Sequence, residues 1–155
     1  KLLYKMKGEV PEGHYTTPIG KAAVRRKGSD LTIVASSIMV HRALEAAEKL
    51  AADGIESEIV YLRSVRPIDH ETILASVRKT GRLMVVHEGV KSYGVGAEIS
   101  AMVSESDAFD FLDAPILRLG GAESPVPYNP DLERAAVPQA DTIEAAARRL
   151  ARGEV

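Results

Sequence analysis

The stretch LTIVAS, residues 31–36, and the helical pattern after it decide the fold of this chain. It is short, apolar and rich in β-branched residues, as in a strand buried on both faces. From Val40 to Ala51 the apolar residues then recur three and four positions apart, the spacing of an amphipathic helix. Gly54 is a typical helix stop. We therefore predict a buried strand followed by a helix that packs on the sheet.

The same alternation continues to the end of the chain. Further strands are predicted at 58–62, 82–87 and 115–119, with helical patterns between them. Pro67 and Asp69 are expected to open one helix. Asp141 is expected to cap the last helix, with Glu144 as its capping-box partner. Apolar strands separated by helices indicate an α/β fold, in which a mainly parallel sheet lies between two helix layers.

Composition excludes several classes of function. The 155 residues contain 20 basic and 22 acidic side chains, a net charge of −2, which argues against a nucleic-acid binder and a polybasic membrane-surface protein. The absence of cysteine excludes disulfides, thiolate metal sites and cysteine nucleophiles. No apolar run reaches the roughly 20 residues of a membrane helix.

The first 20 residues differ from the rest. They are rich in glycine and proline, which indicates a linker or extended arm, and we expect the packed domain to occupy residues 21–155. The chain starts without methionine and without a signal-peptide pattern. We therefore expect it to be cut from a longer protein, with part of any site lying elsewhere.

In parallel sheets, ligands bind beyond the carboxyl ends of the strands. Ser36 and Ser37 lie at such an end, immediately before a predicted helix. We favour helix capping for these serines, with an anion site at the helix start as the alternative. His41, in the first turn of that helix, is expected to be a surface or interface side chain.

Gly94 and Gly96 imitate the start of a dinucleotide-binding fingerprint. The position of the third glycine holds Ile99, so only part of the motif is present. We favour a role in a tight turn and close backbone packing. The alternative is a small-molecule site on this loop.

His87 and Glu88 lie where a predicted strand ends and a loop begins, and they form the weak candidates for a general base. No nucleophile motif and no second metal-ligand histidine accompany them, so we favour hydrogen bonds that anchor the loop. The stretch from Gly120 to Tyr128 contains two glycines and two prolines. Its stiffness and few ionisable groups suit packing or contact with a partner.

Several segments in this order resemble the C-terminal half of the β subunit of thiamine-diphosphate-dependent 2-oxoacid dehydrogenases, which act on pyruvate, branched-chain 2-oxoacids or acetoin. The segments are Gly94–Ile99, Phe111–Pro115, Gly121–Tyr128, Leu132–Glu133 and Pro138. The stretch from Tyr4 to Gly20 is similar to the segment that joins the two domains of that subunit. The resemblance covers essentially the whole chain.

The resemblance implies a transketolase C-terminal-type domain. This is a three-layer αβα sandwich, with Lys21–Arg26 as an antiparallel edge strand on a mostly parallel sheet. Thiamine diphosphate and magnesium would bind between the α subunit and the N-terminal domain of the β subunit. The glutamate that activates the cofactor has no counterpart in residues 1–155. We therefore expect no catalytic, cofactor-binding or metal-binding residue here, and no activity or cofactor binding by this fragment alone.

The resemblance also implies partners: an α subunit and a second β subunit in a heterotetramer, and the subunit-binding domain of a lipoyl acyltransferase. In the family's Leu-acid-Ala-Pro motif, the acidic residue pairs with a basic residue of the acyltransferase, and Asp113 occupies that position. The family also uses its C-terminal carboxylate, for which Val155 is a doubtful equivalent. A cytoplasmic location is expected, with the mitochondrial matrix left open.

Two other interpretations stay open. The chain could be the matching domain of a transketolase-like enzyme, although the Leu112–Pro115 and Pro125–Tyr128 segments speak against it. It could also be a free-standing small-molecule binding module that uses the Gly94–Gly96 loop. The substrate cannot be inferred from these residues.

Overall fold

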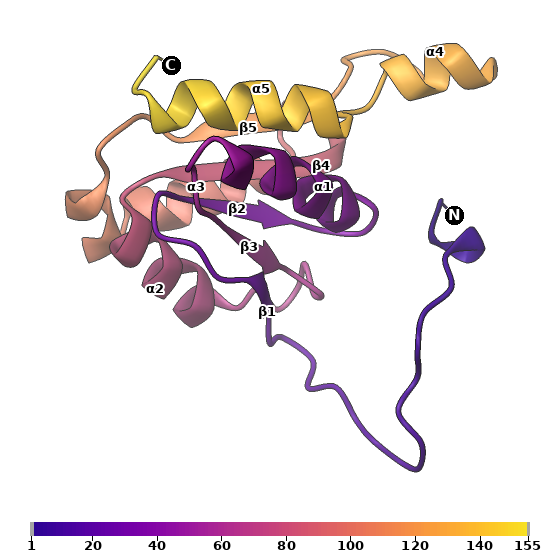
Figure 1. Cartoon of the computed structure of the whole chain (residues 1–155), viewed down its shortest axis with the longest axis horizontal. Coiled ribbons are helices and arrows are strands. Elements are labelled where there is room, and N and C mark those ends of the chain that lie inside the picture. Colours follow the sequence, from indigo (N-terminus) through magenta and orange to yellow (C-terminus); the bar gives the residue numbers. More distant parts are fainter. Residues whose placement is uncertain (1, 155) are drawn as a thin grey trace.

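The computed structural model describes residues 2–154, without the side chains of Leu2 and Lys5. Five strands alternate with helices (Figure 1). The strands are β1 (Ala23–Arg26), β2 (Leu31–Ala35), β3 (Ser57–Tyr61), β4 (Leu83–Val90) and β5 (Leu117–Gly121). The α-helices are α1 (Met39–Ala52), α2 (His70–Thr80), α3 (Val95–Ser104), α4 (Pro130–Ala135) and α5 (Ala140–Ala151). Two short 3-10 helices are η1 (Leu2–Lys5) and η2 (Asp107–Phe111).

The strands form one sheet in the order β1-β3-β2-β4-β5. β2 pairs in parallel with both β3 and β4, and β4 pairs in parallel with β5. β1 runs antiparallel to β3 and forms one edge of the sheet. The expected α/β fold, a mostly parallel sheet with an antiparallel edge strand, is therefore confirmed.

Two hydrophobic clusters lie on opposite faces of the sheet, because successive strand side chains point to opposite sides. Ile33 and Val86 pack with α1 and α5 on one face. Val34 and Val85 pack with α2, α3 and η2 on the other. The strands are thus covered on both sides, which explains why their sequences lack polar alternation.

The capping role expected of Ser36 and Ser37 is wrong. The residue before α1 is Ile38, and no side chain caps that helix. The carbonyl oxygens of Ser36 and Ser37 accept the N–H groups of Met39 and Val40. Ser37 has a φ of 54°, so the backbone itself turns the chain from β2 into α1.

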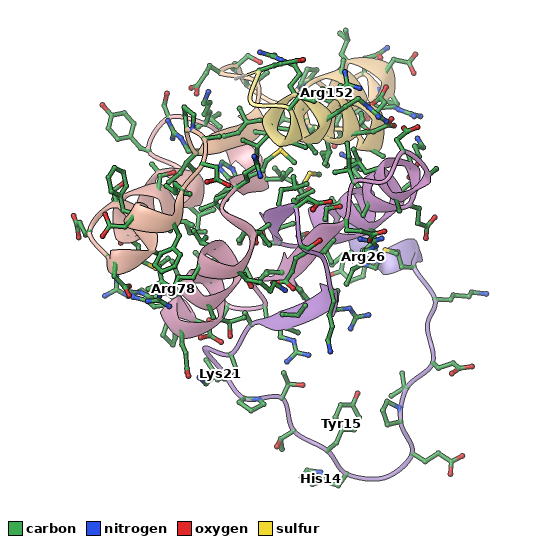
Figure 2. All side chains as sticks on the ribbon, turned by 60° about the vertical axis from the view of Figure 1, so that its left-hand side comes forward. His14, Tyr15, Lys21, Arg26, Arg78 and Arg152 are labelled. Atoms are coloured by element: carbon green, nitrogen blue, oxygen red, sulfur yellow. The ribbon has the colours of Figure 1, made fainter. Side chains whose placement is uncertain are left out.

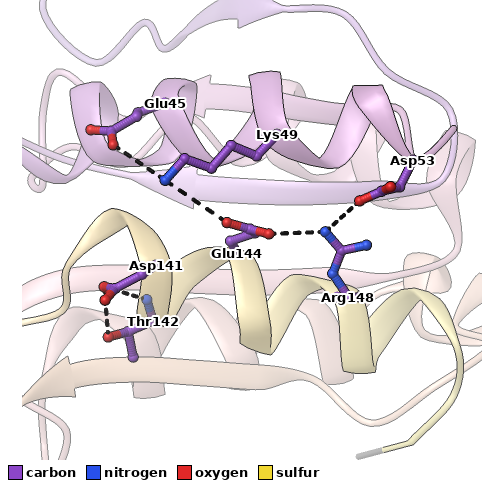
Figure 3. A network of polar contacts seen from close by, with 7 residues as sticks. All are labelled: Glu45, Lys49, Asp53, Asp141, Thr142, Glu144 and Arg148. Carbon is purple, nitrogen blue, oxygen red and sulfur yellow. Dashed lines mark hydrogen bonds and ion pairs between the residues drawn. The ribbon is translucent and has the colours of Figure 1, made fainter.

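The capping box expected at the last helix is also wrong. α5 begins at Ala140, one residue before the predicted cap. Asp141 accepts a hydrogen bond from the N–H of Thr142, its immediate neighbour. Glu144 instead interacts with Lys49 of α1 and Arg148 of α5 (Figure 3). A tertiary interaction between two helices has replaced the local pairing.

The bounds of the strands differ from the predicted ones, most of all in β4 and β5. β4 continues to Val90, so His87 and Glu88 lie within the strand and not at its end. β5 begins two residues later than expected and ends at Gly121. The extension of β4 is stabilised by its pairing with β5, where Val90 lies opposite Gly121. This partner is distant in the sequence, so the local pattern gave no sign of it.

The N-terminal arm leaves the body at β1 and loops away from it (Figure 1). Residues 6–19 are exposed throughout, and His14 and Tyr15 lie near the tip of the loop (Figure 2). Its role as an interdomain segment stays a prediction. Among residues 2–154, none of the helices has the length and apolar character needed to cross a membrane.

Candidate functional site

Asp113 lies in the loop that precedes β5, at the amino end of the parallel strands. Its backbone N–H donates to the carbonyl oxygen of Gly81, at 2.8 Å, and Arg82 places Nη1 3.5 Å from its Oδ2. A Cβ on Gly81 would lie 2.6 Å from the same Oδ2, and Gly81 has a φ of 67°, so glycine is required there. The Asp113 side chain remains 62% exposed. The carboxylate is thus oriented but accessible.

A cleft of about 680 Å³ opens beside this carboxylate. Its wall comes from α3, η2 and the start of β5, and includes Phe109 and Asp110. Phe109 and Phe111 are about half exposed. η2 is fixed to α2 by an ion pair between Arg78 and Asp107, whose hydrogen bond holds the pKa of Asp107 below its usual value. Acidic and aromatic groups on one fixed surface suit a partner that presents a basic side chain next to apolar ones.

His87 and Glu88 do not act together. His87 is 4% exposed and its Nδ1 lies 3.0 Å from the carbonyl oxygen of Gly89, while its Nε2 has no partner within residues 2–154. Burial lowers the pKa of His87, and the charge of Arg118 lowers it further. Glu88 follows it in the strand and lines a cleft together with Arg42 of α1. The two side chains face opposite sides of the sheet, so they form no acid–base pair.

The glycines before α3 pack against His87. A Cβ on Gly94 would lie 2.6 Å from the carbonyl oxygen of Val90 and 2.8 Å from Cε1 of His87. A Cβ on Gly96 would lie 3.0 Å from Nε2 of His87. Ile99, at the third position of the imitated fingerprint, is fully buried. Close packing accounts for both glycines without a nucleotide.

The described residues do not form a metal site that could hold magnesium and a diphosphate. Such a site needs several oxygen ligands around the metal. Within residues 2–154, no three histidine, cysteine, aspartate or glutamate side chains lie close enough to share an ion. The described residues therefore offer no such group of side chains to hold the ion, and no chemical step is assigned to them.

Sequence reasoning missed Arg82, the intramolecular partner of Asp113. Arg82 and Asp113 are 31 positions apart in the sequence (113 − 82); Arg82 comes directly before β4, and Asp113 lies in the loop before β5. The parallel pairing of β4 with β5 brings the two strand starts together. Only the strand order, which no local pattern specifies, could have revealed this neighbour.

Comparison with known proteins identifies relatives of this chain. The family model for the transketolase C-terminal domain matches residues 20–143. The β-1 subunit of the mitochondrial pyruvate dehydrogenase E1 component from Oryza sativa subsp. japonica is 50% identical over 146 residues, which are 94% of this chain and 39% of that protein. The β subunit of acetoin:2,6-dichlorophenolindophenol oxidoreductase from Cupriavidus necator is 48% identical over 99% of this chain and 45% of its own length. The β subunit of 2-oxoisovalerate dehydrogenase from Bacillus subtilis is 45% identical, over 97% and 46%.

A solved structure has the same fold. It is described as a split gene transketolase, an inactive beta4 tetramer, and matches with a TM-score of 0.78 and 28% identity over 96% of this chain and 47% of that one. This chain spans less than half the length of each of these relatives. The family match extends from the start of the edge strand into α5, and so includes the whole sheet. The chain therefore belongs to the transketolase C-terminal domain family.

Proposed function

We propose that this chain is the C-terminal domain of the β subunit of a thiamine-diphosphate-dependent 2-oxoacid dehydrogenase, and that it serves in subunit assembly and in docking of the lipoyl acyltransferase. The observation that carries the proposal is the 45–50% identity to the β subunits of a pyruvate dehydrogenase E1 component, a 2-oxoisovalerate dehydrogenase and an acetoin:2,6-dichlorophenolindophenol oxidoreductase. The split gene transketolase shares only 28%. This difference favours a dehydrogenase β subunit over a transketolase-like enzyme.

In the intact enzyme, the decarboxylation chemistry and the binding of partner subunits would belong to different parts of the protein. Thiamine diphosphate with magnesium supplies the decarboxylation chemistry, and the acyl group then passes to a lipoyl group of the acyltransferase. The residues of this chain hold no part of that cofactor in the proposal. They supply a rigid sheet with helices on both faces, on which partner surfaces can be fixed. An α subunit and a second β subunit complete the enzyme, in the mitochondrial matrix or the cytoplasm according to the host.

The surface around Asp113 is the proposed docking site for the acyltransferase. The distance of 3.5 Å between Arg82 and Asp113 is longer than that of a charge-assisted hydrogen bond, so the existing pair leaves the carboxylate free to accept a second guanidinium. The half-exposed Phe109 and Phe111 offer apolar area beside it. A basic side chain of the subunit-binding domain would therefore bind Asp113, while its apolar neighbours cover the aromatic rings.

Reconstitution tests this function. The full-length β polypeptide would be expressed with its α subunit, and the assembled enzyme supplied with the lipoyl acyltransferase. We expect 2-oxoacid-dependent acylation of the lipoyl groups, and co-purification of the acyltransferase with the enzyme. A transketolase-like activity on sugar phosphates without any lipoyl acylation would show that the proposed function is wrong.

A further inference from the structure

A second cleft, of about 420 Å³, lies at the opposite end of the sheet from Asp113. It is bounded by Arg42 in the first turn of α1, Glu88 near the end of β4, and the segment that carries α4. β2 and β4 are neighbours whose connections lead to opposite sides of the sheet, to β3 and to β5. Open α/β sheets bind ligands at such a switch point, outside the carboxyl ends of the strands. The volume lies in the range of small-molecule sites, about 300–1,000 Å³.

Four charged side chains line this cleft: Arg42, Glu88, Glu133 and Arg134. Within residues 2–154, none of them takes part in an ion pair, and the only side-chain hydrogen bond among them joins Arg42 to the carbonyl oxygen of Pro138. Burial lowers the pKa of Arg42, and the charges of Glu88 and Arg134 act on it from nearby, in opposite directions. Two cationic and two anionic side chains thus line one cleft without forming ion pairs with one another.

The rest of the wall is apolar and held in shape. Val126, Pro130 and Val137 line the cleft, and the Val126 side chain is 74% exposed. The amide nitrogen of Gln139 donates to the carbonyl oxygens of Arg134 and Val137, which fixes the connection between α4 and α5. Figure 1 shows α4 set apart from the body of the domain, beyond the start of α5. A ligand in this cleft would therefore lie between this segment and the sheet.

We propose that the cleft binds a zwitterionic aliphatic amino acid. Its carboxylate would bind the guanidinium groups of Arg42 and Arg134, where bidentate hydrogen bonds are available. Its ammonium group would bind the carboxylate of Glu88, and its side chain would cover Val126 and Val137. A ligand with a single charge could pair only with the arginines or only with the glutamates of the cleft, whereas a zwitterion can pair with side chains of both signs. This inference goes beyond the proposed function and does not depend on it.

Titration with L-leucine tests the inference, by calorimetry and by NMR shifts of residues around the cleft. Two analogues separate the charges: 4-methylpentanoate lacks the ammonium group and 3-methylbutylamine lacks the carboxylate. We expect saturable binding of leucine, and binding at least about tenfold weaker for each analogue. Equal affinities for leucine and either analogue would overturn the zwitterion assignment, and no saturable binding of leucine would overturn the site.

Variants locate the binding. Arg134→Gln and Glu88→Gln remove charges that form no ion pair or side-chain hydrogen bond within residues 2–154, so both proteins should stay folded. Each should weaken leucine binding at least about tenfold. Arg152→Gln and Glu105→Gln, exposed and remote from the cleft, are the matched controls and should bind leucine as the wild type does. Unchanged affinity in both cleft variants would mean that leucine binds elsewhere and would overturn the proposal.

Discussion

Asp69 is a buried carboxylate that joins the start of α2 to the residues just before β1. It accepts hydrogen bonds from the N–H of Ala22, at 2.9 Å, and from the N–H and hydroxyl of Thr72, and Lys21 lies 3.9 Å away. Burial alone would raise the pKa of Asp69, but these hydrogen bonds and the charge of Lys21 together hold it below its usual value. Asp69 thereby caps α2 and fixes the start of β1 against it.

This pKa predicts how stability depends on pH. Because the folded state lowers the pKa of Asp69, its ionised form adds stability above the unfolded pKa of about 3.9, and this contribution is lost as the pH falls through the folded value. Asp69→Ala should therefore lower the free energy of unfolding by about 1–3 kcal/mol at pH 7, from the lost cap and the unpaired N–H of Ala22. Urea unfolding from pH 7 to pH 3 measures this. The difference in the free energy of unfolding between wild type and Asp69→Ala should shrink in acid, and a difference that stays constant would contradict the lowered pKa of Asp69. Asp141→Asn, at an exposed position, is the control.

Gly94 and Gly89 both follow His87 in the sequence and lie next to its side chain, so they form a matched pair. A Cβ on Gly94 would meet the carbonyl oxygen of Val90 at 2.6 Å, whereas a Cβ on Gly89 would meet only Nδ1 of His87, at 3.8 Å. Gly94→Ala should therefore destabilise the protein by about 1–3 kcal/mol through overpacking, and Gly89→Ala by much less. Thermal unfolding of the two variants compares them. Equal shifts would mean that close packing is not the reason for glycine at position 94.

At the scale of elements, the sequence predicted the strands and helices well but misplaced several of their ends. The apolar runs and the three/four spacing identify β2, α1, β3 and β4, because burial in the core dictates both patterns. The caps predicted for α1 at Ser36 and for α5 at Asp141 are wrong, because local capping competes with backbone turns and with contacts between helices. The 3-10 helix η2 was not predicted at all.

The interface between α1 and α5 shows why the local sequence pattern did not predict the contacts of Glu144. A network of charged groups runs from Glu45 through Lys49 and Glu144 to Arg148 and Asp53 (Figure 3). Beneath it, the core positions of α5 are fully buried against the sheet and α1. They are Ile143, Ala147 and Leu150. Glu144 therefore interacts with side chains that come close to it only when α1 and α5 pack together, and not with the start of its own helix.

Two variants separate the contributions to this interface. Leu150→Ala should lower the free energy of unfolding by about 2–5 kcal/mol, because Leu150 is fully buried and its loss leaves a cavity. Arg148→Ala should have a much smaller effect that decreases with added salt, because its ion pairs with Asp53 and Glu144 are only partly buried and salt still screens them. Urea unfolding at low and high salt measures both. If Arg148→Ala costs as much as Leu150→Ala, the charged network and not the core holds α5.

At the scale of the whole molecule, the two ends of the sheet carry different surfaces. Asp113, Arg82 and the aromatic cleft lie at the amino end of the parallel strands, and the cleft of Arg42 and Glu88 lies at the carboxyl end. The sequence alone, with the family resemblance, predicted Asp113 as a docking residue. It could not predict Arg82 or the carboxyl-end cleft, because both depend on strand order and on how α4 lies against the sheet.

The central claim is that this domain docks the acyltransferase through Asp113. The most direct test is the affinity of the isolated subunit-binding domain for the assembled enzyme, with wild-type β subunit, with Asp113→Asn, and with Asp141→Asn as the exposed control. We expect Asp113→Asn to weaken binding at low salt by at least about tenfold, or roughly 1.4 kcal/mol. The loss should shrink at high salt, because screening already weakens the wild-type pair. Decarboxylation measured without the partner should be unchanged. Equal affinities of wild type and Asp113→Asn at low salt would contradict the claim.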